Sequence, residues 1–229
     1  MAKKKIPRKA LLSTQDEFIT FSTRLLQFTV KYRLQIAGAF GGLLALIVIF
    51  SGLRYFSSKA EERAFAALDR GIKYYESVLK EGGAQIAFEA ARKDFEPLLE
   101  KYSRKKAGKL ARVYFANICY KAGQFDRAIG LYKKGLEDFE DNEILKAMIL
   151  SGLGYNYEGK KDYQAAVEHF EVIVSNPEAI MKDEALFNLG KIYAVIGQTA
   201  KSMAAYNRLV AEHPDSIYYN LVKEKISGS

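Results

Sequence analysis

One pattern of large and small residues occurs three times, and it limits the chain to architectures built from stacked copies of one unit. The copies begin at Phe115, Leu153 and Leu189, at intervals of 38 and then 36 residues. Each copy has the same residue types at the same offsets. A large residue stands beside a small one, a Gly or Lys follows, and a second small residue then precedes an aromatic residue. We interpret each copy as two helices joined by a turn, and the whole as an all-α fold.

The second small residue of each copy lets the two helices of a hairpin approach closely; these residues are Ala128, Ala166 and Ser202. This layout resembles the tetratricopeptide repeat family, whose units are helix–turn–helix pairs stacked in a solenoid. Residues 57–229 are therefore predicted to form a tetratricopeptide-like domain of about four hairpins and a C-terminal capping helix after Pro214. The first hairpin would begin near residues 60–79, and Pro97 should kink its second helix or end it early.

A second constraint is the uncharged stretch at residues 34–53, whose 20 residues would form a helix about 30 Å long, the thickness of a bilayer core. Tyr32 before it and Tyr55 after it match an interfacial aromatic belt. The alternatives are a buried soluble helix and a cleaved signal peptide, but the lack of charge and the long leader favour a transmembrane helix. Gly38 and Gly42 have the spacing that permits close helix packing in a membrane.

The net charge of +8 is concentrated in residues 1–33, which carry eight Lys and Arg against two acidic residues. The remaining chain is close to neutral, so nucleic acid is not an expected partner. A short basic tail favours a cytoplasmic N-terminus and places the large C-terminal domain outside the cytoplasm. Apolar residues in this tail recur every three or four positions, which predicts an amphipathic helix; they are Phe18, Phe21, Leu25, Phe28 and Tyr32.

No combination of side chains indicates catalysis. The chain has a single cysteine, Cys119, and two histidines, His169 and His213, with no spacing that would build a metal site. None of the three has the partners of a catalytic triad in the sequence. We therefore expect neither an enzyme, nor a cofactor, nor a small-molecule substrate.

Binding is the better expectation, because a stacked hairpin array presents a groove lined by its first helices. Helical spacing places seven side chains on this face: Val113, Asn117, Tyr120, Ser151, Tyr155, Phe187 and Lys191. The mixed, aromatic lining favours extended or helical apolar segments of a protein partner. Packing of the same aromatics against neighbouring helices is an equally open alternative.

The order of basic tail, membrane helix and degenerate repeats resembles the bacterial ancillary Sec translocon subunit family. The resemblance is carried by Asp16-Glu17-Phe18, Arg54-Tyr55-Phe56 and the run from Ala60 to Ala64. It implies a single-pass inner-membrane protein with a periplasmic domain, whose partners are translocon subunits, periplasmic chaperones or exported polypeptides. A scaffold for envelope assembly, on cell-wall or outer-membrane machinery, and an accessory subunit of a membrane complex are the alternatives.

Overall fold

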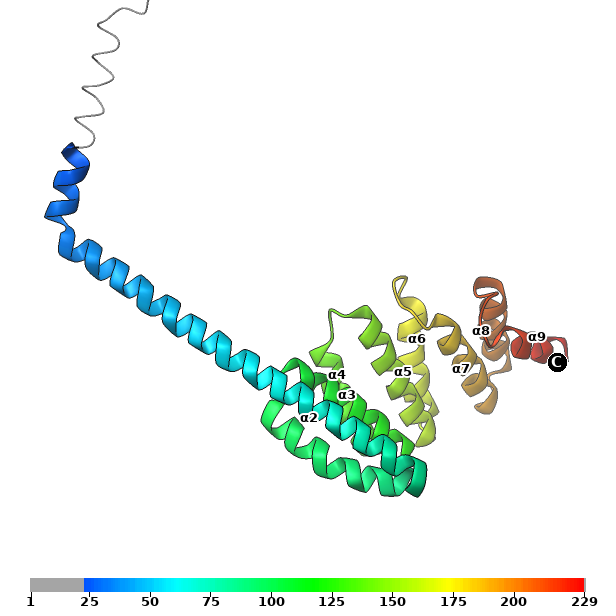
Figure 1. Ribbon diagram of the computed structural model, residues 1–229. Helices are drawn as coiled ribbons and strands as arrows, with labels where there is room; N and C mark the ends of the chain where they lie inside the picture. Colours follow the sequence, from blue (N-terminus) through cyan, green and yellow to red (C-terminus); the bar gives the residue numbers. More distant parts are fainter. Residues whose placement is uncertain (1–22, 229) are drawn as a thin grey trace, which may run out of the picture. The chain divides into compact units, whose positions relative to one another are not determined.

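A computed structural model describes residues 23–228, most of which are helical, with no strand among them. The all-α prediction is therefore confirmed for this part of the chain. After a helical segment at residues 23–31, the helices are α2 (Arg33–Tyr102), α3 (Lys106–Lys121), α4 (Phe125–Asp138), α5 (Glu143–Gly159), α6 (Tyr163–Ser175), α7 (Lys182–Val195), α8 (Thr199–Glu212) and α9 (Tyr219–Ser227) (Figure 1). The chain divides into two compact units, one ending at Lys59 and one beginning at Ala60.

The first unit contains the uncharged stretch, which lies entirely within α2. An 18-residue window of this helix has a mean hydropathy of 2.3, and none of that window is buried. By length and composition the helix could cross a membrane, although a signal sequence near an N-terminus has the same properties. Leu25 and Phe28 of the predicted amphipathic helix are helical and exposed, whereas Phe18 and Phe21 lie outside the described residues.

The second unit opens with a hairpin formed inside α2. Gly83 has φ 75° and ψ 178°, a left-handed conformation that favours glycine, and it separates two arms of the helix. Tyr75 on the first arm and Phe88 and Phe95 on the second are buried in one core. Pro97 lies inside the second arm, yet the helix continues to Tyr102, so the proline does not end it early.

Three later turns reverse the chain at equivalent positions of the repeat. Gly123, Lys161 and Gly197 all have positive φ values, of 72°, 63° and 75°. Glycine adopts this conformation without a steric penalty, whereas Lys161 does so at a cost of about 1 kcal/mol. The Gly or Lys that recurs in every copy of the sequence pattern thus has a left-handed backbone conformation.

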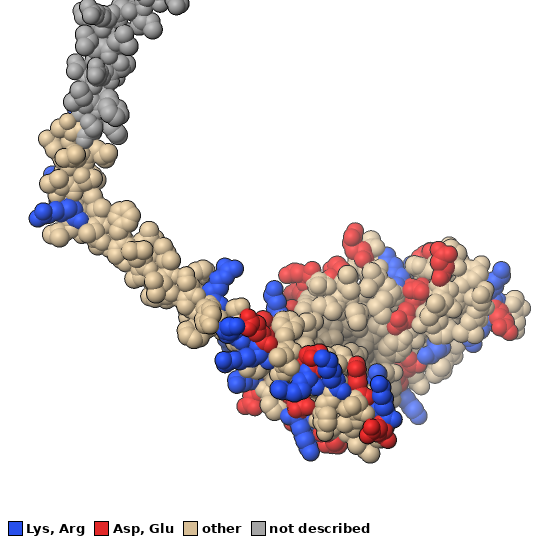
Figure 2. All heavy atoms as spheres, in the orientation of Figure 1, with Lys and Arg blue, Asp and Glu red and all other residues tan. Residues whose placement is uncertain are grey.

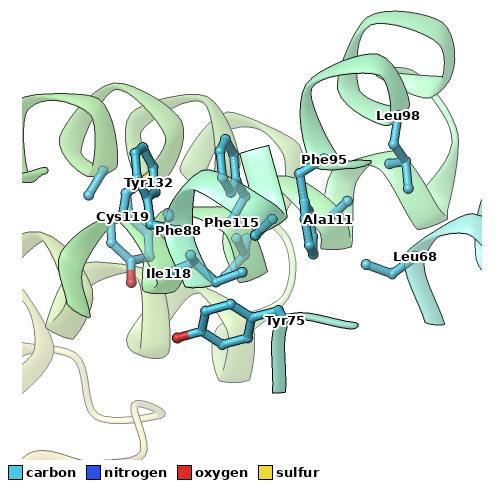
Figure 3. Close-up of a cluster of buried hydrophobic side chains, with 14 of the residues drawn as sticks. Leu68, Tyr75, Phe88, Phe95, Leu98, Ala111, Phe115, Ile118, Cys119 and Tyr132 are labelled. Atoms are coloured by element: carbon cyan, nitrogen blue, oxygen red, sulfur yellow. The ribbon is translucent and has the colours of Figure 1, made fainter. Parts of the chain in front are cut away.

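Two hydrophobic cores run through the second unit. The first joins both arms of α2 to α3, α4 and the middle of α5, and it contains a stack of aromatic rings (Figure 3). The ring centroid of Phe115 lies 5.3 Å from that of Phe95 and 6.1 Å from that of Phe88. The second core joins α5 to α9, and Val222 of α9 is completely buried in it. Each helix therefore packs on its sequence neighbours, as in a helical solenoid.

The small residues of the repeat lie where the helices meet. Ala128 and Ala166 are completely buried, and Ser202 is 4% exposed. The Ser202 hydroxyl donates a hydrogen bond to the Gly190 carbonyl oxygen at 2.7 Å, so the serine is satisfied inside the third hairpin. A larger residue at these places would separate the two helices of a hairpin.

Candidate functional site

A hollow of about 590 Å³ lies at the C-terminal ends of α3 and α5, on the side of the first helices. Its walls include Tyr120 of α3, Phe125 at the start of α4, Tyr155 of α5 and Lys191 of α7. Three successive hairpins therefore contribute to one surface. We call it the first-helix hollow.

Aromatic rings form the apolar part of the first-helix hollow. The Tyr120 ring centroid lies 6.1 Å from the centroids of both Phe125 and Tyr155. Tyr155 in turn meets Phe170 edge-on, with centroids 5.6 Å apart. Tyr120 is 36% exposed, so its ring presents apolar area that a ligand could cover.

Opposite charges lie at the rim of this hollow. The Lys191 ammonium is 3.1 Å from a carboxylate oxygen of Glu158, and both side chains are partly exposed. An exposed pair of this kind contributes about 0–1 kcal/mol to stability, so either partner can turn to a ligand at small cost. The first-helix hollow thus combines an apolar floor with one positive and one negative side chain at its rim. Such a surface matches a segment of polypeptide better than it matches an anion.

A hydrogen-bond network beneath the hollow fixes α5 against α7. One carboxylate oxygen of Glu184 accepts hydrogen bonds from the Ser151 and Tyr155 hydroxyls, both at 2.8 Å. The Asn188 amide donates to the Tyr155 hydroxyl oxygen at 2.9 Å. Burial, followed by the hydrogen bond to Glu184, raises the pKa of Tyr155, which keeps its hydroxyl a donor.

The seven predicted groove residues lie in different environments. Tyr120, Tyr155 and Lys191 come together at the first-helix hollow. Val113 and Ser151 are 7% and 4% exposed, so the prediction that they line an accessible groove does not hold.

The other two predicted residues contact tyrosine side chains of this chain. The Phe187 ring is stacked on Tyr218, with centroids 4.4 Å apart, and is therefore partly covered by the segment before α9. Asn117 is exposed, but its side-chain oxygen accepts a hydrogen bond from the Tyr132 hydroxyl at 2.6 Å. Helical periodicity identifies the face of a helix, whereas the neighbouring hairpin decides which part of that face stays open.

Sequence reasoning missed Glu184 and Asn188, which position the tyrosine of the hollow. Their spacing of four residues places them on one face of α7, toward α5. The signal that could have found them is a pair of hydrogen-bonding residues four positions apart on a first helix. Glu184 and Asn188 lack counterparts at the aligned positions of the preceding copy, which hold Met148 and Gly152.

A second hollow, of about 690 Å³, lies between the second helices α6 and α8 over a floor from α7. Its floor residues Leu186 and Leu189 are 1% and 4% exposed, so they are already buried by the fold. Lys201 at its edge lies over the Tyr193 ring, 5.2 Å from the centroid. The aromatic residue of this second hollow, Tyr193, is 6% exposed, whereas Tyr120 of the first-helix hollow is 36% exposed.

Of the three reactive residues noted in the sequence, Cys119 is buried, and His169 and His213 are partly buried. Cys119 is completely buried, and burial raises the pKa of its thiol to about 12, so the thiolate is not populated at neutral pH. His169 stacks on Tyr157 with ring centroids 5.4 Å apart, and His213 caps the end of α8. Within residues 23–228 no group of three or more potential ligands is placed to hold a metal ion.

The His169 environment predicts a pH-dependent stability. Burial, and then the positive charge of Lys133, lower the pKa of His169 below its ordinary value of 6.5. The unfolded chain therefore binds a proton more readily, and the stability present above pH 6.5 is lost as the pH falls through the folded-state pKa. We expect His169→Phe to flatten the decline of unfolding free energy between about pH 7.5 and 5 in urea titrations, and an unchanged slope would contradict this.

Gly38 and Gly42 lie on α2, where an added Cβ would meet no atom within 4 Å. The described chain thus leaves this surface of the helix open. Close packing of another membrane helix on these glycines stays a prediction.

A comparison with family models supports the repeat. A tetratricopeptide repeat family model matches residues 184–216, which contain most of α7, all of α8 and the turn that follows. No curated protein matches the chain. Among solved structures, the crystal structure of BtubC (BKLC) from P. vanneervenii is similar with 13% identity and a TM-score of 0.49, over 73% of this chain and 82% of that one.

The hairpins and the matched repeat together place the chain in the class of all-α proteins with a tetratricopeptide-like repeat. Proteins built from such repeats bind other chains on the surfaces of their stacked helices. The resemblance to the ancillary Sec translocon subunits is a separate matter, and it stays a prediction.

Proposed function

We propose that this protein is a membrane-anchored adaptor that binds other proteins through the first-helix hollow and catalyses no reaction. The observation that carries the proposal is the set of rings of Tyr120, which is exposed, and of Phe125 and Tyr155, which are partly buried, supplied by consecutive hairpins beside a partly exposed ion pair. Exposed aromatic side chains in a concave surface are the groups that dominate protein-binding energy.

The chemistry of the hollow favours an apolar segment of polypeptide, extended or helical. An apolar or aromatic side chain of the ligand would cover Tyr120, while its polar backbone and charges meet Lys191 and Glu158 at the rim. A clamp for a terminal carboxylate has less support, because buried Val113 stands where the first lysine of such a clamp would be.

We further propose a cellular setting. Residues 34–53 would span the bacterial inner membrane once, with the basic tail in the cytoplasm and the repeats in the periplasm. There the repeats would associate with the Sec translocon and pass exported polypeptides toward periplasmic chaperones. Support comes from the uncharged stretch, the asymmetric charge and the sequence resemblance. A reporter fused after Ser229 that is active only outside the cytoplasm tests the orientation.

The binding proposal predicts a position-specific crosslinking pattern. A photoreactive residue at Tyr120 or Lys121 should capture translocon subunits or exported polypeptides in cells, because both positions are exposed beside the first-helix hollow. Tyr155 is unsuitable, since its hydroxyl holds the network with Glu184. The matched control is Lys201, exposed at the edge of the other hollow, which should capture neither.

The same surface predicts a loss of affinity. Removing one central aromatic of a binding surface costs about 2 kcal/mol, so Tyr120→Ala should weaken binding of a captured client about 30-fold. Lys201→Ala should leave the affinity within about twofold.

Two crosslinking results would contradict these proposals. Capture of cell-wall or outer-membrane machinery at residue 120, with no translocon subunit or exported chain, would contradict the translocon setting. Equal capture at residues 120 and 201 would contradict the first-helix hollow as the binding site.

A further inference from the structure

The turn between α2 and α3 carries a cluster of basic side chains. Residues 104–109 read RKKAGK and contain four Lys and Arg with no acidic residue. Arg104 and Lys106 are exposed, as is Arg63 on the first arm of α2. Figure 2 shows Lys and Arg side chains gathered at the end of the repeat unit where α2 enters it.

Two contacts fix this turn against α2. The Ala107 backbone N–H donates a hydrogen bond to a Glu61 carboxylate oxygen at 2.8 Å, which supplies the N-terminal cap that α3 lacks from its own residues. Gly108 lets the start of α3 pass close to the Tyr102 carbonyl, where any Cβ would clash. Residues 104–109, which we call the basic turn, are therefore held beside Glu61.

The position of Glu61 in the sequence keeps the basic turn near the uncharged stretch. Glu61 follows Leu53, the last residue of that stretch, by eight residues. Even a fully extended chain of eight residues reaches only about 28 Å. This limit holds for any relative placement of the two units. If residues 34–53 span a bilayer, the basic turn is within reach of the lipid headgroups.

A hollow of about 410 Å³ opens between this turn and the end of α4. Four cations line it, against two acids, Glu137 and Asp138. Asp138 pairs with Arg112 and, at 3.3 Å, with the Lys109 ammonium. The other two cations are Arg104 and Lys134, and residues 23–228 offer neither of them an ion pair. An anionic group could therefore bind at the mouth of this hollow.

We propose that the basic turn and this hollow bind the phosphates of anionic lipid headgroups in the leaflet that faces the repeat unit. The inference rests on the membrane anchor of the proposed function. Guanidinium and ammonium groups match phosphate oxygens in charge and hydrogen-bonding geometry. Each Lys or Arg at an anionic surface strengthens the association by a factor of about five. The repeats would thereby be held at the bilayer, and the first-helix hollow with them.

Hydrogen exchange of the full-length protein in lipid nanodiscs tests the inference. Backbone amides of residues 103–109 should exchange at least about fivefold more slowly in discs of phosphatidylcholine with phosphatidylglycerol than in phosphatidylcholine alone. The difference should disappear in about 0.5 M salt, which screens the charges. The double variant Arg104→Glu with Lys106→Glu should abolish it as well.

The matched control is Lys201→Glu with Lys223→Glu, which reverses two exposed charges on α8 and α9 and should keep the protection. Thermal melts identify unfolded variants, and Arg104→Gln with Lys106→Gln replaces the reversal if that one does not fold. Failure to enter either disc would contradict the membrane anchor itself. Entry with equal exchange in both discs would overturn the lipid inference alone, and so would equal protection by inorganic phosphate in neutral discs.

Discussion

Gly108→Ala is expected to lower the free energy of unfolding by about 3 kcal/mol, because the structure has no room for a Cβ at this position. An ideal Cβ would lie 1.9 Å from the Tyr102 carbonyl oxygen and 2.6 Å from its carbon. These atoms belong to the backbone, so relief requires α3 to move away from the end of α2. Such a movement would also break the hydrogen bond from Ala107 to Glu61.

Denaturant titration followed by circular dichroism measures this loss, and Gly130→Ala provides the control. Gly130 is exposed in the interior of α4, and an added Cβ there meets no atom within 4 Å. Alanine reduces the entropy of the unfolded chain and should stabilise the protein by about 0.5–1 kcal/mol. Similar effects of the two substitutions would contradict the tight approach at Gly108.

Phe115→Ala is expected to cost about 3–5 kcal/mol, the range for a phenylalanine removed from a packed core. The side chain is completely buried and its ring stacks with those of Phe88 and Phe95 (Figure 3). The Arg127 guanidinium lies 5.1 Å from the ring centroid and would lose this contact as well. Because Phe88 and Phe95 belong to the second arm of α2, that arm should lose its protection from hydrogen exchange first.

Phe65→Ala is the matched control for this deletion. Phe65 lies on the first arm of α2 and is 42% exposed, so its removal should cost about 1 kcal/mol or less. Denaturant titrations of the two variants are directly comparable, since both replace a benzyl side chain by a methyl group within the same compact unit. Equal losses would show that the stacked rings do not hold α2 on α3.

The hairpins could be predicted because their determinants are local and repeated. A turn residue with positive φ at Gly123, Lys161 and Gly197 and a buried small residue in each second helix recur at constant offsets. Gly83 similarly separates the two arms of α2. Short-range signals of this kind remain visible in one sequence because each acts within a few residues of its own position.

The candidate site was harder to predict, because its accessibility depends on distant residues. Tyr120 and Phe187 were expected on the same groove, yet Tyr218 partly covers Phe187 while Tyr120 remains 36% exposed. Ser151 was expected at the surface, but it is buried and donates to Glu184, which is 33 residues away. A pattern of helical spacing contains no information on which hairpin closes over which side chain.

The amino-acid sequence by itself determined the helical class, the repeat interval and the turn positions, because periodic apolar side chains and left-handed glycines act locally. Tertiary structure alone decided that Glu61 caps α3, that three hairpins share one aromatic hollow and that four basic side chains line another hollow at the α2–α3 turn. These features depend on atoms 30 or more residues apart meeting within a few ångströms. Such meetings are fixed by the packing of whole helices, which no short window of sequence specifies.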